Sequence, residues 1–290
     1  MNIDIIASGL ASGLLLGGML ALTALGLSIT LGVMRLVNLA HGELLIGGAY
    51  LAFFLVQQAG LNPIAALPLV GLGIGLVAWP VQRLLVAPLG GKGMEAPMMT
   101  MFGLSIIVQN LFLVAFKADT RSIDTPYAAT PVTLGPVTVP ALYLIGFVIS
   151  VALVVAVHWL VSRTGFGRAL RAASADPTAA AVQGVDVKRV HALTFALGAA
   201  CAGMGGVLIG AAFSFTPAGG ATYLLISFAV VVLGGVGNIF GTLVAGIAMG
   251  LLQSLGGLVF GDGYRDLVGL LVFLLALAFK PQAITGQGVR

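Results

Sequence analysis

The sequence predicts an all-α protein, a polytopic transmembrane helical bundle in a single domain over residues 1–290. Hydrophobic residues make up 59% of the chain and charged residues 8%, and the mean hydropathy is +1.13. Soluble domains carry about 25% charged residues. The apolar residues form continuous runs, and a helix needs roughly 20 of them to cross a bilayer core. A transmembrane β-barrel would instead need short alternating segments.

Nine apolar segments follow one another along the chain. The first has no Lys or Arg before Arg35 and is longer than the apolar region of a signal peptide, so it is predicted to be a retained span. The seventh is short and ends in LGGVGN, which predicts a half-span or a re-entrant helix beside eight full spans. The predicted segments are 8–31, 38–58, 62–86, 98–116, 140–161, 190–213, 222–236, 239–256 and 266–280.

Basic residues predict the orientation of these spans. Cytoplasmic loops carry an excess of Lys and Arg, so the longest basic loop, 163–190, is taken as cytoplasmic. Alternation then places ten of the 13 Lys and Arg residues inside, and only Lys117, Arg121 and Arg265 outside. The N-terminus is predicted to lie outside and the C-terminus in the cytoplasm. Pro and Thr in the external loop 117–139 favour strands and turns, which suits a small cap, a docking surface or an ordered linker.

Polar residues are concentrated in GVMRLVNLAHGELLIGGAY, residues 32–50. Arg35 is predicted to anchor the cytoplasmic boundary, where its long stem can snorkel. Asn38, His41 and Glu43 carry polarity into the second span, where an ionisable group costs about 2.5–3.5 kcal/mol at the centre. On a continuous helix Asn38 and His41 would lie about 60° apart and His41 and Glu43 about 160° apart. We therefore expect two separate polar neighbours.

Glu43 is the strongest single candidate, because it is the only acidic residue that we place within a membrane span. It could pair with Arg35 or with a basic or polar group of a partner subunit. Three roles are open: a clamp on a broken helix, a gate or pathway residue in the cytoplasmic half, and a proton relay.

Glycine is abundant, with 42 residues. Small residues four apart allow close helix packing in lipid, and such faces either pack tightly or slide during a transport cycle. The spacing occurs at Gly13 and Gly17, Gly237 and Gly241, and Gly246 and Gly250.

The run LGGVGNIFG, residues 233–241, predicts a helix break at membrane depth. Such a break is tolerated where protein or a watery cavity satisfies the freed backbone groups. Its residues are Gly234, Gly235, Gly237 and Asn238. The run lacks the Lys and Ser/Thr of a Walker A motif, and no other segment supplies one. We therefore expect no nucleotide site of that kind in this chain.

Local signals in the 163–190 loop predict a short helix. Asp176, followed by proline, is a helix start. The helix runs over 178–183 and is closed by Gly184 in a left-handed conformation. Asp186 is the expected N-cap of the next span. A helix of about two turns is unstable alone, so it packs either on this protein or on a partner.

Three ordered motifs resemble the LivH-type permeases of branched-chain amino acid ABC transporters, and the resemblance covers essentially the whole chain. The motifs occupy residues 32–50, 167–208 and 230–253. The resemblance implies a permease subunit that imports branched-chain amino acids or a related small polar solute across a bacterial inner membrane. It implies a second related permease, two ATP-binding subunits and an extracytoplasmic solute-binding protein as partners. ATP and Mg would then be bound by the ATPase subunits, and this chain would bind no cofactor.

The resemblance also implies that the 163–190 loop couples the permease to its ATPase. The matching positions are Asp176, Ala179, Ala180 and Gly184. An EAA-type docking motif would begin with an acidic residue, where this chain has Thr178.

Other functions are less consistent with the sequence. A stand-alone proton-coupled secondary transporter could use His41 and Glu43 as proton carriers. An intramembrane enzyme would need catalytic residues, but no Ser/His/Asp set, paired carboxylates or metal-ligand cluster is evident, and Cys201 is the only cysteine. The basic residues are spread over loops, which does not indicate nucleic-acid binding. Among solutes, leucine, isoleucine and valine are expected first, with urea, amides, and aromatic or carboxylate compounds as alternatives.

Overall fold

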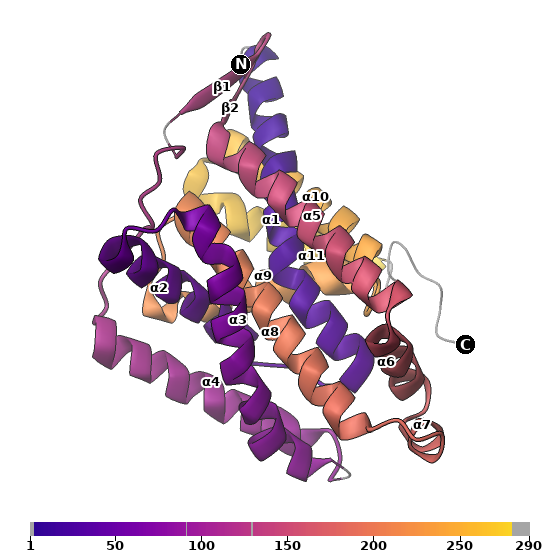
Figure 1. Cartoon of the computed structure of the whole chain (residues 1–290). Helices are drawn as coiled ribbons and strands as arrows, with labels where there is room; N and C mark the ends of the chain where they lie inside the picture. The colour runs from indigo at the N-terminus through magenta and orange to yellow at the C-terminus, as the bar shows by residue number, and fades with distance from the viewer. Residues whose placement is uncertain (1–2, 91, 129, 280–290) are drawn as a thin grey trace.

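The computed structural model describes residues 3–90, 92–128 and 130–279, and within these it is a bundle of helices (Figure 1). Eight helical segments of the described chain are long and apolar enough to cross a membrane, which confirms the predicted fold class. The helices are α1 (Ile3–Met34), α2 (His41–Ala59), α3 (Pro63–Val81), α4 (Glu95–Phe116), α5 (Ala141–Arg163), α6 (Gly165–Ala175), α7 (Pro177–Val182), α8 (Val187–Ala212), α9 (Gly220–Gly234), α10 (Ile239–Phe260) and α11 (Arg265–Phe279).

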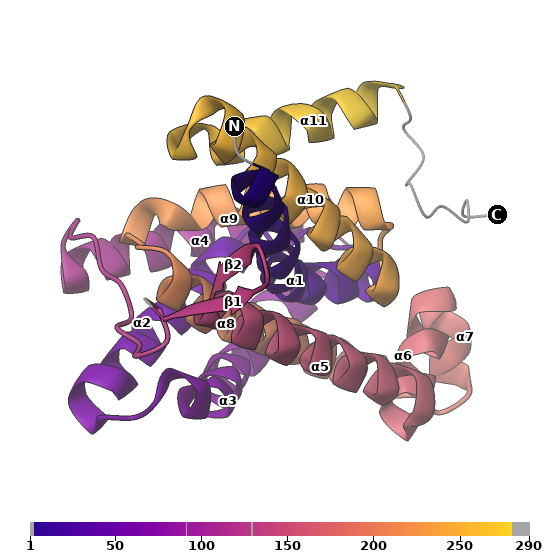
Figure 2. The same cartoon turned by 90° about the horizontal axis from the view of Figure 1, so that it is seen from above.

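The first helix forms the centre of the bundle. Every residue of α1 from 15 to 30 is buried, and α5, α8, α9 and α10 pack around it. Figure 2 shows α1 end-on, with the other helices on all sides of it. A helix that is apolar all round has no preferred outer face, so it suits this fully enclosed position.

Glycines bring α1 and α10 into backbone contact. A methyl group added at Gly17 would lie 2.6 Å from the carbonyl oxygen of Gly246, and one added at Gly250 would lie 2.5 Å from the Cα of Gly17. Gly13 faces the same stretch of α10, since a methyl group added at Gly13 would lie 2.9 Å from the carbonyl oxygen of Gly250. The tight packing predicted from the glycine spacing is confirmed for these two pairs.

Two of the predicted segments correspond to short helices, α9 and α11. The segment predicted as a half-span is α9, which has 15 residues, and a preceding turn extends it to Pro217–Gly234. The predicted last span, 266–280, corresponds to α11, of which 15 residues are described. The end of that span and the C-terminus, whose cytoplasmic location was predicted, lie outside the described residues.

The predicted external loop forms an ordered cap at the end of the bundle where α1 begins. Its strands β1 (Pro131–Leu134) and β2 (Val137–Pro140) form an antiparallel hairpin, and the Thr138 N–H donates to Ser8 Oγ at 3.0 Å. Arg121 exchanges two backbone hydrogen bonds with Phe215, of 2.9 and 2.7 Å. In Figure 1 the hairpin lies beside the N-terminus, and α6 and α7 lie at the opposite end.

Candidate translocation site

The polar stretch after α1 is not the continuous helix that the sequence predicts. Arg35 is left-handed, with φ of 50°, and α2 begins only at His41. Asn38 makes a local turn in which its Oδ1 accepts from the Ala40 N–H at 3.0 Å and its carbonyl accepts from the His41 N–H at 3.2 Å. Asn side chains compete with helix by such bonds. The predicted span 38–58 therefore starts too early, and Asn38 is not on a helix face.

The second helix begins inside the bundle. The His41 ring nitrogen Nε2 lies 2.8 Å from the carbonyl oxygen of Thr23, about two-thirds of the way along α1. Residues 35–40 therefore run back beside α1, from its end at Met34 toward Thr23, before α2 begins. His41 is 1% exposed, so its ring is fixed between α1 and the first turn of α2.

The ninth helix also begins inside the bundle, at the same place. After α8 the chain runs back through an irregular segment to Gly220, the first residue of α9. A methyl group on Gly42 would lie 2.6 Å from the carbonyl carbon of Gly220, and one on Gly220 would lie 2.7 Å from the carboxyl carbon of Glu43. Two helix starts therefore meet at the Glu43 side chain.

Glu43 is buried there, with 4% exposure. Its Oε1 accepts from Ser105 Oγ of α4 at 3.4 Å, and its Oε2 has no hydrogen-bond partner among the described residues. A carboxylate is stabilised near a helix N-terminus, where free N–H groups carry partial positive charge. The first turns of α2 and α9 supply this environment. Buried polar groups are normally satisfied, so the unpartnered oxygen makes Glu43 a candidate for contact with a group that lies outside the described residues.

Of the two partners considered for Glu43, Arg35 forms no ion pair with it in the described residues. Arg35 is exposed at the other end of residues 35–40. The ion pairs in the described part of the chain are Arg121 with Asp119, at 4.0 Å, and Arg265 with Asp262, at 3.9 Å. His41 and Glu43 do meet different neighbours, α1 on one side and α4 and α9 on the other, as their angular separation predicts.

The predicted helix break lies at the other end of α9. Gly235 and Gly237 are left-handed, with φ of 87° and 77°, and Asn238 caps α10 by accepting from the Gly241 N–H at 2.9 Å. The Gly237 N–H donates to Ser28 Oγ of α1 at 3.2 Å. The Ser28 side chain thus accepts a hydrogen bond from a backbone N–H that the helix break leaves without a helical partner. Gly234 lies about 21 Å along α9 from Gly220, so the break and Glu43 form two separate sites.

The capped helix predicted in the basic loop is confirmed as α7. Asp176 Oδ1 accepts from the N–H groups of Thr178, at 2.8 Å, and Ala179, at 3.0 Å, and Gly184 is left-handed with φ of 84°. Ala179 is exposed, but Ala180 is 4% exposed and faces its own protein. The large apolar side chain that α7 exposes is Val182, at 84%, a residue that was not among the predicted coupling positions.

The sequence analysis also missed α6, which precedes α7. Thr164 Oγ1 caps it by accepting from the Gly167 N–H at 3.2 Å. Gly167, Leu170 and Ala173 are its buried residues. This spacing of three is a helical signal that could have been found in the sequence.

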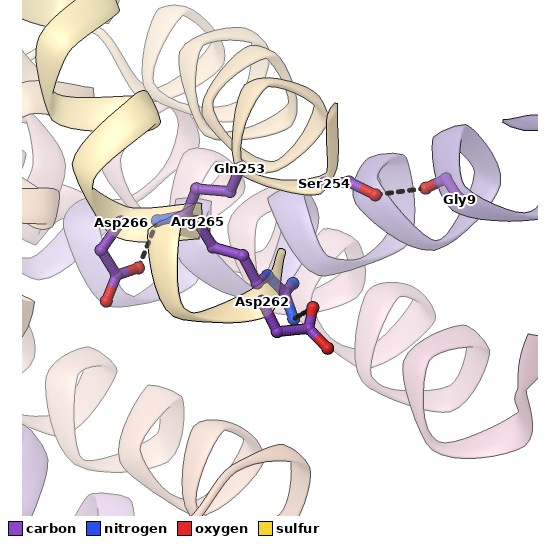
Figure 3. A network of polar contacts seen from close by, with 6 residues as sticks. All are labelled: Gly9, Gln253, Ser254, Asp262, Arg265 and Asp266. Carbon is purple, nitrogen blue, oxygen red and sulfur yellow. Dashed lines mark hydrogen bonds and ion pairs between the residues drawn. The ribbon is translucent and has the colours of Figure 1, made fainter. Parts of the chain in front are cut away.

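A cavity of about 430 Å³ opens at the end of the bundle that carries the hairpin. We call it the hairpin-end cavity. Figure 3 shows its polar side, where Gln253 Nε2 of α10 donates to Asp266 Oδ1 of α11 at 3.0 Å. Arg265 and Asp262 form their ion pair beside it, and Ser254 Oγ donates to the Gly9 carbonyl at 2.6 Å. The sequence analysis assigned none of these residues to a site.

A second cavity, of about 560 Å³, opens at the opposite end, between α1, α4, α8 and the turns after α3. Its polar lining residues include Arg35, Gln82, Lys188 and His191. Gln82 Oε1 and His191 Nε2 are buried without a hydrogen-bond partner in the described residues. Arg35, which is predicted as a boundary anchor, thus lines a basic cavity and not the Glu43 site.

Comparison with known proteins decides the family. The chain matches the family model described as branched-chain amino acid transport system / permease component over residues 9–277. The chain belongs to this family. The permease is similar to BraD of Pseudomonas aeruginosa, with 29% identity over 291 residues that cover 96% of this chain and 95% of BraD. It is similar to LivH of Escherichia coli K12, with 28% identity over 307 residues, 95% of this chain and 94% of the relative.

An archaeal protein is similar over the same length. The permease and the probable LivH of Methanocaldococcus jannaschii are 26% identical over 289 residues, 96% of this chain and 91% of the relative. All three relatives are named branched-chain amino acid transport permease proteins. No solved structure gives a significant match. With its family and its membrane-length helices, the chain is a multi-pass membrane permease component.

Proposed function

We propose that this permease is the membrane subunit of an ABC importer for branched-chain amino acids or a related small polar solute in a bacterial inner membrane. ATP is hydrolysed by partner subunits. The observation that carries the proposal is the meeting of two helix starts, α2 and α9, at the buried carboxylate of Glu43. Discontinuous helices whose termini point into the bundle are a recurrent feature of transporter solute and gating sites. The names of the relatives support the solute class.

The exposure of α4 supports a second permease as partner. Pro97 and Met101 are the buried residues of α4, and nearly all the rest of the helix is at least partly exposed in the single chain. Its Ser105 nevertheless touches Glu43. In the assembly we propose, the related permease packs beside α4, and the solute passes between the two subunits near Glu43.

We place the ATP-binding subunits at α6 and α7. The orientation predicted from the basic residues puts these helices in the cytoplasm and the hairpin outside, where the solute-binding protein would dock. The exposed α7 face suits insertion into a groove of the ATPase.

Reconstitution tests the proposal. In proteoliposomes the purified permease alone is expected to give no leucine uptake under a proton gradient, because in this proposal uptake is driven by ATP hydrolysed on partner subunits. The complete set of subunits with Mg-ATP and the binding protein should import leucine. Robust gradient-driven uptake by the permease alone would support the secondary-transporter alternative. ATP-driven import of another solute, without leucine, would keep the importer and replace its substrate.

Changing Val182 to Asp is expected to reduce recovery of the ATPase with the permease about tenfold. Burial of a Val side chain contributes about 1.5–3 kcal/mol, and 1.4 kcal/mol is a factor of ten in affinity. The measurement is co-purification of the ATPase with tagged permease. Gln183→Glu adds the same charge at the next position with little change in shape and should bind like the unchanged protein. Full recovery with Val182→Asp would rule out α7 as the docking element.

A further inference from the structure

The hairpin-end cavity has the dimensions of a small-molecule site. Its volume of about 430 Å³ lies within the range of about 300–1,000 Å³ typical of ligand pockets. Its apolar lining includes four buried side chains of α1, α8 and α9, namely Leu16, Leu20, Ile209 and Ile226, together with Phe213 directly after α8. This apolar floor would accept an aliphatic side chain.

A positive charge lies at the mouth of this cavity. Arg265 reaches Asp262 only at 3.9 Å, and its guanidinium lies over the Phe213 ring, 5.2 Å from the centroid. A guanidinium has five N–H donors and binds carboxylates with two of them at once. Arg265 also hydrogen-bonds the Tyr143 side chain. These two contacts leave further N–H donors of the guanidinium for the carboxylate of a ligand.

A negative charge lies beside it. Asp266 accepts from Gln253 Nε2 at 3.0 Å, and Gln253 is 3% exposed, so the partner is held in place (Figure 3). The amide is neutral, and the neighbouring Arg265 interacts with the carboxylate charge without forming an ion pair with it among the described residues. Because a charged hydrogen bond is roughly twice as strong as a neutral one, an ammonium group is the partner that Asp266 favours.

Two glycines position these groups. A methyl group on Gly257 of α10 would lie 2.9 Å from Cγ of Arg265, and one on Gly269 of α11 would lie 3.1 Å from Cγ of Gln253. Without side chains at these positions, α10 and α11 approach closely, and the stems of Arg265 and Gln253 lie against the facing helix. The polar side of the cavity is therefore built by helix packing rather than by a loose loop.

We propose that the hairpin-end cavity binds a small aliphatic amino acid as its zwitterion. Arg265 takes the α-carboxylate, Asp266 takes the α-ammonium group, and the apolar floor takes the side chain. The inference rests on the proposed function and adds a binding site within the permease itself. The cavity lies close to the start of α2, because its lining residue Leu20 is one turn of α1 from Thr23, whose carbonyl contacts His41. Sugars and uncharged amides lack the carboxylate and ammonium charges that Arg265 and Asp266 would bind.

Cysteine protection tests the site without any partner subunit. Ser214 is exposed and lines the cavity, and the native Cys201 is fully buried, so Ser214→Cys offers one accessible thiol among the described residues. Leucine at ten times its Kd is expected to slow maleimide labelling of this thiol about tenfold. Leucinamide, which lacks the carboxylate, and 4-methylpentanoate, which lacks the ammonium group, should protect far less. Ser122→Cys, exposed at the same end but outside the cavity lining, is the matched control.

Charge-neutral variants complete the test. Arg265→Gln and Asp266→Asn, each combined with Ser214→Cys, should abolish protection by leucine while the protein keeps its elution profile. Equal labelling with and without leucine, or equal protection by leucinamide, would overturn the site. If the complete importer still carries leucine in that case, the proposed function stands and only the cavity assignment fails. Protection without ATP-driven import of any solute by the complete system would instead contradict the proposed function.

Discussion

Changing Glu43 to Gln is expected to lower transport by the assembled importer about tenfold while the subunits still co-purify. The amide keeps the shape of the side chain and can still accept from Ser105. It removes the charge that lies beside the first turns of α2 and α9, an interaction worth up to about 2 kcal/mol in partly buried sites. A change of 1.36 kcal/mol in an activation barrier is tenfold in rate. The measurement is the initial rate of ATP-driven leucine uptake.

Two variants separate the charge from the packing. Glu43→Asp keeps the charge and should retain more transport than Glu43→Gln. Ser105→Ala removes the single hydrogen bond to the carboxylate and should have a smaller effect than either, because that bond is long at 3.4 Å. Transport at the unchanged rate in Glu43→Gln would leave Glu43 as a structural clamp and remove it from the pathway.

The spans were predictable because bilayer thickness sets the length of an apolar helix. Local chemistry likewise predicted α7, since Asp176 and Gly184 act on their own backbone neighbours. The glycine pairs of α1 and α10 were predicted as packing faces, but the sequence did not show that Gly17 meets Gly246 and Gly250. That pairing depends on how the helices cross in space.

The site was only partly predictable. Asn38 was placed on a helix because its neighbours are apolar, yet its own side chain makes a turn, and the Thr23 carbonyl, far away in sequence, holds the start of α2. The charges of the hairpin-end cavity were missed for a similar reason. Gln253 and Asp266 lie on two helices joined by a turn, and their contact exists only when α10 and α11 pack. The polar residues can be identified from the sequence, but which of them come into contact depends on how the helices pack.

Changing Gly250 to Ala is expected to destabilise the folded permease strongly, because the added methyl group meets the backbone of α1. The added Cβ would lie 2.5 Å from the Cα of Gly17, and it would overlap other backbone atoms of Gly13 and Gly17. Backbone cannot rotate away as a side chain can, so α10 must move from the central helix. Overpacking typically costs about 1–3 kcal/mol. At about 2–4 °C per kcal/mol for a chain of this size class, the apparent melting temperature should fall by roughly 2–12 °C. Thermal unfolding of the purified permease in detergent measures this change in melting temperature.

The matched control is Gly103→Ala in α4. Nothing lies within 4 Å of a Cβ at Gly103, and Ala favours a helix interior over Gly by about 1 kcal/mol. The same chemical change should therefore leave the melting temperature unchanged or raise it. Because the two substitutions share their effect on helix propensity, the difference between them isolates the contact of α1 with α10. Equal melting temperatures for the two variants would mean that this contact is not close in the folded protein, and the enclosed position of α1 would have to be revised.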